Sequence, residues 1–162
     1  MIILGIDPGV ERVGYAFFRK KSPADFSYLS SGLIKTEKKL ALEIRLEKIY
    51  SSLESLIVNN KPDIIVLERV FFFKNQKTIV MVGQAQGVIL LLAAQYHIEA
   101  LFLTPPQIKQ IVTGYGQSDK KNIQKMLRLS LGLSQELEQD DRADAIATAF
   151  AYCCMKKNLL DY

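Results

Sequence analysis

The chain has 162 residues, of which 49% are hydrophobic and 23% are charged, a balance typical of one soluble domain with its own core. Lysine and arginine outnumber aspartate and glutamate by 21 to 17, giving a net charge of +4, which mildly favours a polyanionic partner and excludes a histone-like tail. The apolar stretch at residues 79–94 is too short and too interrupted to span a membrane. The adjacent Cys153 and Cys154 cannot pair in an ordinary disulfide, so we expect reduced thiols and a cytoplasmic location. No basic segment followed by an apolar run opens the chain, so we expect no signal peptide.

Apolar patterns predict strands and helices in an alternating order after an initial three-stranded meander. The expected elements are, in order, strands at residues 2–6, 13–19 and 26–36, a helix at 40–58, a strand at 63–68, a helix at 76–96 and a strand at 98–103. Three further helices follow. The first is short, opened by Thr104 and Pro105 and broken at Gly114, the second is capped by Ser118 or Asp119 and runs to about 131, and the last covers 141–156. We expect Gly9 and Gly14 to flank the first turn. This order predicts an α/β fold, a mixed five-stranded sheet flanked by helices on both faces. One domain would cover residues 1–157, followed by a short tail at 158–162.

Two predicted buried strands end on a carboxylate. Asp7 follows the run IILGI, and Glu68 follows IIVL. If these strands are parallel neighbours, their acids lie side by side at the edge where open α/β sheets place their sites. Asp141 and Asp144 are spaced i, i+3 in DDRADA and therefore share one face of the last helix. A cluster of four carboxylates repels itself by up to about 4 kcal/mol per pair at 4 Å, so it must protonate or find cations.

Two kinds of cation could neutralise this cluster. Arg69 and Arg142 are close enough in sequence to form a salt-bridge network, and capping roles for single acids are also common. The alternative is a divalent metal, because all-oxygen ligands select hard ions such as Mg²⁺ or Mn²⁺. Two such ions about 4 Å apart would activate water and stabilise the leaving oxygen in phosphodiester hydrolysis. The only histidine, His97, is expected at the surface or in packing.

Four motifs, GIDPGVERVGY, LERVFFFKN, GQAQGV and DDRADAIATAF, follow in the order and spacing of the RuvC family, and the resemblance covers nearly the whole chain. The resemblance to these Holliday-junction resolvases implies a ribonuclease-H-like fold, a homodimer and Mg²⁺-dependent paired nicking of four-way DNA junctions in recombination and repair, with Mn²⁺ as a possible substitute. Carried over by motif, the catalytic and metal-binding acids are Asp7, Glu68, Asp141 and Asp144. Asp140 is the neighbour that competes with Asp141 for this assignment.

The segment after Glu68 and several lysines are candidates for DNA contacts. The resemblance implies that Phe71 stacks on an unpaired base, although Phe72 and Phe73 depart from commoner family residues and at least one of the three rings is expected in the core. The resemblance also implies that Lys109 and Lys120 contact DNA phosphates close to the catalytic acids. The complete set of DNA-binding candidates is Phe71, Lys74, Lys77, Lys109, Lys120 and Lys121. Lysine contacts to phosphates give position rather than sequence specificity.

The long helix at 76–96 is apolar around most of its circumference. One face can cover the sheet, and Gly83, Ala85 and Gly87 would let a second helix approach closely, so we predict a twofold dimer through this helix. The alternative is a helix wholly buried in one domain. The resemblance also suggests RuvA and RuvB as partners. Two other functions remain open, namely a ribonuclease-H-like nuclease acting on RNA and a non-catalytic junction-binding protein. An actin-like ATPase is disfavoured because no second glycine-rich phosphate loop is present.

Overall fold

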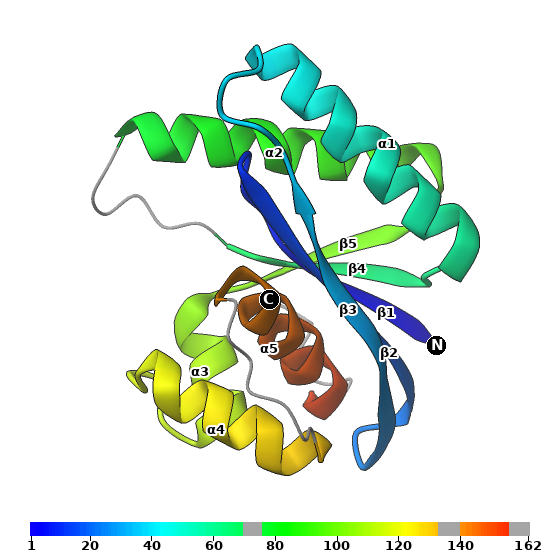
Figure 1. Cartoon of the computed structure of the whole chain (residues 1–162). Helices are drawn as coiled ribbons and strands as arrows, with labels where there is room; N and C mark the ends of the chain where they lie inside the picture. Colours follow the sequence, from blue (N-terminus) through cyan, green and yellow to red (C-terminus); the bar gives the residue numbers. More distant parts are fainter. Residues whose placement is uncertain (70–75, 133–139, 156–162) are drawn as a thin grey trace.

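A central sheet separates two helical layers in the computed structural model, which describes residues 1–69, 76–132 and 140–155, without the side chains of 76–78 and 140 (Figure 1). The elements are β1 (Ile2–Asp7), β2 (Arg12–Ser22), β3 (Asp25–Lys35), α1 (Leu42–Asn60), β4 (Ile64–Glu68), α2 (Gln76–Gln95), β5 (Glu99–Leu103), α3 (Pro105–Thr113), α4 (Lys120–Leu131) and α5 (Asp140–Cys154). The strand order is β3-β2-β1-β4-β5. Strands β1, β2 and β3 pair antiparallel, whereas β1, β4 and β5 pair parallel. The predicted mixed five-stranded α/β sheet is confirmed.

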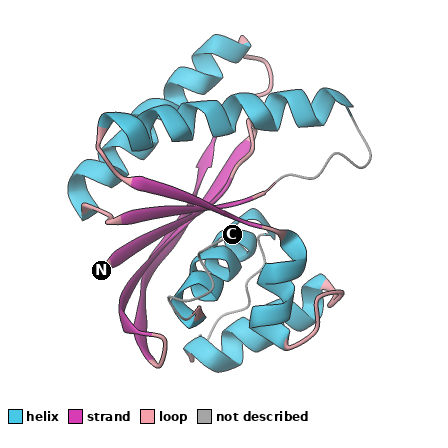
Figure 2. Cartoon of the chain, turned by 180° about the vertical axis from the view of Figure 1, so that it is seen from behind, coloured by secondary structure: helices cyan, strands magenta, loops and turns pink. Residues whose placement is uncertain are grey.

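Helices cover both faces of the sheet, α1 and α2 on one side and α3, α4 and α5 on the other (Figures 1 and 2). Successive residues of a strand point to opposite faces, so Leu4 packs under α1 and α2 while Ile3 packs under α5. Both side chains are fully buried. The central strands read as continuous apolar runs because both of their faces are covered.

Local sequence explains where the short helices begin. Thr104 caps α3 in a capping box with Gln107, next to Pro105 at the first helical position. Asp119 caps α4 by accepting a hydrogen bond of 2.8 Å from the backbone N–H of Asn122. The alternative cap, Ser118, instead pairs its hydroxyl with that of Thr113 at 2.6 Å.

Gly14 lies in β2 and pairs with Asp7 of β1 at the end of the ladder beside the first turn, as predicted. The close packing of α5, rather than the turn, explains why this position is a glycine. A Cβ atom at Gly14 would overlap the backbone carbonyl oxygen of Asp141 in α5. Strand β2 is longer than the predicted 13–19, because it continues to Ser22 in a hairpin with β3, whereas β3 has its predicted length and begins one residue earlier.

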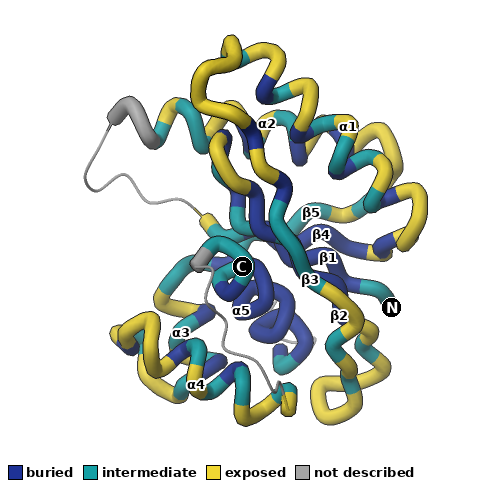
Figure 3. Tube along the Cα trace, viewed as in Figure 1, coloured by how far each residue is buried: buried dark blue, intermediate teal, exposed yellow. Residues whose placement is uncertain are grey.

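Helix α5 is the most deeply buried helix of the described chain (Figure 3). Its alanine-rich sequence, ADAIATAFA, presents small side chains that allow close approach to the sheet. Within the described ranges, no helix combines the length and apolar character needed to cross a membrane.

Candidate functional site

The first two acids lie at neighbouring strand ends. Strands β1 and β4 pair parallel, and Ile6 stands opposite Leu67 in their register. Asp7 and Glu68 are the next residues along each strand, so both carboxylates emerge at the same edge of the sheet. Both residues are half-buried. The prediction that these two acids lie side by side is therefore confirmed by the register.

Two glycines bring the helix that carries the other acids onto this edge. A Cβ atom at Gly5 would lie 2.7 Å from both the backbone oxygen of Ala145 and the Cβ atom of Ala149 in α5. At Gly14, as described above, it would collide with the backbone of Asp141. Because neither strand position carries a side chain, the α5 backbone lies directly against β1 and β2. The first turn of α5 is thereby held beside the end of β1.

The electrostatics of the site show that the four carboxylates influence one another. Burial, followed by the charges of Asp144, Glu68 and Asp141, raises the pKa of Asp7 from 3.8 to about 8, against a smaller opposing effect of Lys120. Burial and then the charge of Asp144 raise the pKa of Glu68 from 4.5 to about 7. Burial of a carboxyl group beside other carboxylates produces such shifts.

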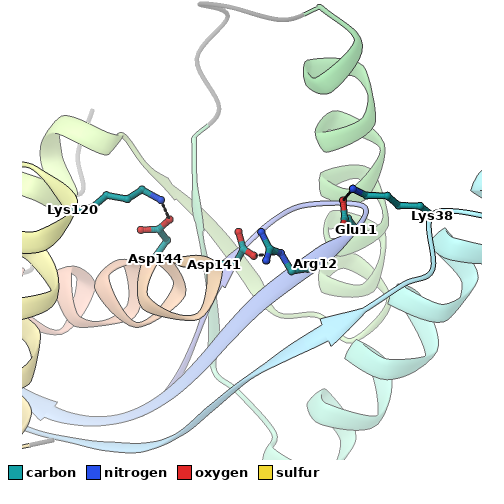
Figure 4. Close-up of polar contacts among 6 residues, drawn as sticks. All are labelled: Glu11, Arg12, Lys38, Lys120, Asp141 and Asp144. Carbon is teal, nitrogen blue, oxygen red and sulfur yellow. Dashed lines mark hydrogen bonds and ion pairs between the residues drawn. The ribbon is translucent and has the colours of Figure 1, made fainter. Parts of the chain in front are cut away.

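Two basic side chains contact the acids of α5 (Figure 4). Nε of Arg12 lies 2.5 Å from Oδ2 of Asp141, and Nζ of Lys120 lies 3.1 Å from Oδ2 of Asp144. Oδ2 of Asp141 is buried, and its contact with Arg12 is an ion pair. The positive charge of Lys109 also lowers the pKa of Glu68, which indicates that it lies near this acid.

The arginines that sequence proximity suggested as neutralising partners are engaged elsewhere. Nε of Arg142 donates a hydrogen bond of 2.7 Å to Oγ of Ser31 on β3. The guanidinium of Arg69 lies over the ring of Phe102, 5.8 Å from its centroid. Neither arginine is paired with an acid within the described part of the chain.

The donor set suits hard divalent cations. It consists of carboxylate oxygens alone, and burial together with the charges of neighbouring acids raises the pKa of both strand-end acids. As they stand, the described side chains include no group of three or more acids, histidines or cysteines spaced to hold a metal ion. Asp141 and Asp144 are turned toward Arg12 and Lys120, so metal binding would require these two acids to turn away from their basic partners.

The raised pKa values predict an unusual pH dependence of the metal-free protein. Between about pH 4 and pH 8 the folded protein keeps protons on Asp7 and Glu68 that the unfolded chain releases, so the free energy of unfolding should fall as the pH rises. Urea denaturation with EDTA at pH 5 and pH 8 checks this expectation. The fall should be smaller in an Asp7→Asn, Glu68→Gln double variant, and an equal fall in both proteins would show that these acids do not cause it.

The DNA-binding candidates are only partly within the described structure. Phe71 and Lys74 lie outside the described residues, and so does the side chain of Lys77. Lys120 begins α4 beside the acids and is exposed, as is Lys121. Lys109 is half-buried and lies on α3, which covers the same face of the sheet as the α4 helix that carries Lys120 (Figure 1). The structure thus brings Lys109 and Lys120 near the acids and shows no comparable contact for Lys121.

Sequence reasoning missed Arg12 as a neighbour of the acids. It follows the glycine turn after Asp7, in the motif GVERVGY, but its contact with Asp141 depends on the docking of α5. The only indication in the sequence was that Arg12 lies five positions after Asp7, the acid that ends the first strand.

The comparisons with known proteins agree with this geometry. The family model for crossover junction endodeoxyribonuclease RuvC matches residues 3–152. The chain is 40% identical over 160 residues to RuvC of Caldicellulosiruptor saccharolyticus, covering 99% of this chain and 96% of that protein. It is 46% identical over 152 residues to RuvC of Petrotoga mobilis, covering 94% and 93%. The solved structure of Thermus thermophilus RuvC in complex with a Holliday junction substrate superposes with a TM-score of 0.88 at 26% identity, covering 95% of each chain. The chain therefore belongs to the RuvC family of crossover junction endodeoxyribonucleases and has its ribonuclease-H-like fold.

Proposed function

We propose that this protein resolves Holliday junctions by paired symmetric nicks, through metal-dependent phosphodiester hydrolysis in recombination and DNA repair. The observation that carries the proposal is the convergence of Asp7 and Glu68, on adjacent parallel strands, with the first turn of α5. Membership of the RuvC family supports the same activity, as does the relative whose solved complex contains a junction.

In this proposal each part of the site has a separate task. Asp7, Glu68, Asp141 and Asp144 are the catalytic acids and would hold two Mg²⁺ ions, for which Mn²⁺ can substitute. Ions bound there would activate a water and stabilise the leaving oxygen. Lys120 forms an ion pair with Asp144 of the cluster. When Asp144 rotates to bind a metal ion, Lys120 would be released to contact a DNA phosphate.

Lys109 would hold a second phosphate from its place on α3, and Lys121 would add a weaker contact farther out. For Phe71, Lys74 and Lys77 the proposal rests on the family resemblance alone. Phosphate contacts of this kind predict junction affinity that falls with salt concentration.

The function is tested by offering the protein a synthetic mobile four-way junction, with and without Mg²⁺, and mapping product ends on all four strands. The expected result is a pair of nicks at symmetric positions in two strands, dependent on the metal. Duplex DNA and structured RNA of matched length serve as controls. Preferred cleavage of RNA would favour the alternative ribonuclease, and junction binding without cleavage in any metal would favour a non-catalytic binding protein.

We also propose a homodimer through α2, because paired nicks need two sites. Val80, Gly83, Gly87 and Leu91 lie at helical spacing along one exposed face of α2, with side chains of Val80 and Leu91 more than half exposed. A Cβ atom at either glycine would meet nothing within 4 Å. Ala85, the other small residue predicted at this contact, is fully buried and therefore does not lie on this exposed face.

Replacing Leu91 with Glu should separate the dimer, because it places a charge in an apolar helix contact. Sedimentation velocity at micromolar concentration is expected to show a dimer for the unmodified protein and a monomer for Leu91→Glu. Leu129→Glu, which changes an exposed leucine of α4, is the matched control and should leave the dimer intact. A strict monomer before any substitution would refute this arrangement.

Residues 1–157 would form a single nuclease domain, with 158–162 as a short tail. RuvA and RuvB are the partners we propose for handing over junctions, in the cytoplasm. Co-sedimentation of the protein with a RuvA-bound junction would test the first of these associations.

A further inference from the structure

A pocket of about 520 Å³ opens beside the acids, between the turn that joins β1 to β2, the segment that precedes α1 together with its first turn, and the N-terminal half of α2. Three basic side chains line it, namely Arg12, Lys38 and Arg45. Asp141 lines it as well, so the pocket adjoins the candidate active site directly. None of these basic residues was singled out by the sequence.

Arg45 is the unusual member of this group. It is only 6% exposed, although arginine is seldom buried without a partner. Its Nε donates a hydrogen bond of 2.9 Å to Oγ1 of Thr36, and that hydroxyl donates one of 2.6 Å to the backbone oxygen of Val10. The guanidinium is thus fixed in orientation, yet in the described ranges no carboxylate lies within ion-pair distance of it.

The remaining charges of the pocket are already matched. Arg12 lies against Asp141, and Nζ of Lys38 lies 3.1 Å from Oε2 of Glu11 (Figure 4). Three cations and two carboxylates leave a net charge of +1, carried by Arg45. A buried cation that lacks an acid is costly, and one phosphodiester group, with its single negative charge, would balance it.

We propose that this pocket binds a backbone phosphate of the cleaved strand, next to the phosphate that is hydrolysed. The planar guanidinium of Arg45 offers a fork of donors that matches two phosphate oxygens. On the far side of Asp141 stand Asp144 and Lys120 (Figure 4). The strand would therefore cross the acids with one phosphate held on the Arg45 side and another on the Lys120 side. This inference rests on the proposed junction cleavage and adds the site that positions the strand.

The first test is junction binding in EDTA, where no cleavage occurs, measured across a range of salt concentrations. Arg45→Met should weaken binding about tenfold and lower the slope of log affinity against log salt by about 1, as expected for one lost phosphate contact. Lys38→Met leaves Glu11 unpaired in the pocket and should weaken binding several-fold. Lys48→Met, which removes an exposed charge from the same helix as Arg45, is the matched control and should bind normally.

The second test identifies the phosphate. Single neutral methylphosphonate linkages are placed in turn along the cleaved strand of the junction. One linkage beside the cleavage point should slow cleavage by the unmodified protein about tenfold and should have no added effect in Arg45→Met or Lys38→Met. Thermal unfolding checks that Arg45→Met is folded, and if it is not, Lys38→Met decides the question alone.

The outcomes separate this inference from the proposed function. If the unmodified protein cuts the junction, but the pocket variants bind like Lys48→Met and no linkage loses its effect in them, the pocket is not a phosphate site. If the unmodified protein cuts no junction, the proposed function fails first. Normal binding by the pocket variants in EDTA would overturn the phosphate site in that case too.

Discussion

Replacing Asp7 with Asn is expected to abolish junction cleavage while leaving junction binding intact. Burial and the charges of Asp144, Glu68 and Asp141 act together on the carboxylate of Asp7, which ends β1 beside Glu68. Loss of a metal-binding carboxylate removes several kcal/mol of transition-state stabilisation, and each 1.4 kcal/mol is a factor of ten in rate. We therefore expect single-turnover cleavage in Mg²⁺ to fall at least about a thousandfold.

The same substitution should stabilise the metal-free protein, which a purely structural role for Asp7 would not produce. At pH 8.5 the asparagine removes a charge that repels the neighbouring acids, so the melting temperature should rise by at least about 2–4 °C, the shift that 1 kcal/mol causes in a chain of this size. Mg²⁺ should raise the melting temperature of the unmodified protein and have little effect on the variant. Asp25→Asn, at the exposed β2–β3 hairpin, is the control and should change neither cleavage nor stability. Unchanged cleavage by Asp7→Asn would defeat the assignment of this residue.

Replacing Gly14 with Ala is expected to separate the acids without altering any of them. The added Cβ atom would overlap the backbone oxygen of Asp141, and a backbone neighbour cannot rotate away as a side chain can. Overpacking of this kind typically costs about 1–3 kcal/mol. Helix α5 must shift away from β2, which moves Asp141 and Asp144 relative to Asp7. Cleavage should fall at least about a hundredfold, since a misplacement of about 1 Å can have that effect.

Gly116→Ala is the matched control for stability, because a Cβ atom there would lie 3.4 Å or more from its neighbours. Urea denaturation should show a loss for Gly14→Ala and little change for Gly116→Ala. If Gly14→Ala remained as stable and as active as the unmodified protein, the close docking of α5 would not be what brings the acids together.

The sequence predicted those parts of the site that depend on local pattern. A continuous apolar run closed by an acid marks a buried strand and its end, which is why Asp7 and Glu68 could be found in advance. Spacing along one helix likewise joined Asp141 to Asp144. The mixed sheet with helices on both faces followed from the order of the predicted elements, whereas the order of the strands within the sheet came from the structure.

The parts that escaped prediction depend on how distant segments dock. The packing of α5 against Gly14 was not predicted, because a glycine required by a packed helix looks the same in sequence as one required by a turn. Arg12 meets Asp141 only after α5 docks on β2. Arg45 occupies a core position of an amphipathic helix, and only the fold shows that its guanidinium faces a pocket beside the acids.

The central claim is that Asp7, Glu68 and the acids of α5 converge to hold hard divalent ions. Crystals grown with Mn²⁺ and measured for anomalous scattering test this claim most directly. We expect anomalous peaks between the carboxylates of Asp7, Glu68 and Asp144, with Asp144 turned from Lys120 toward the metal. Absence of any peak at these acids at millimolar Mn²⁺, with Asp141 still on Arg12 and Asp144 still on Lys120, would contradict it.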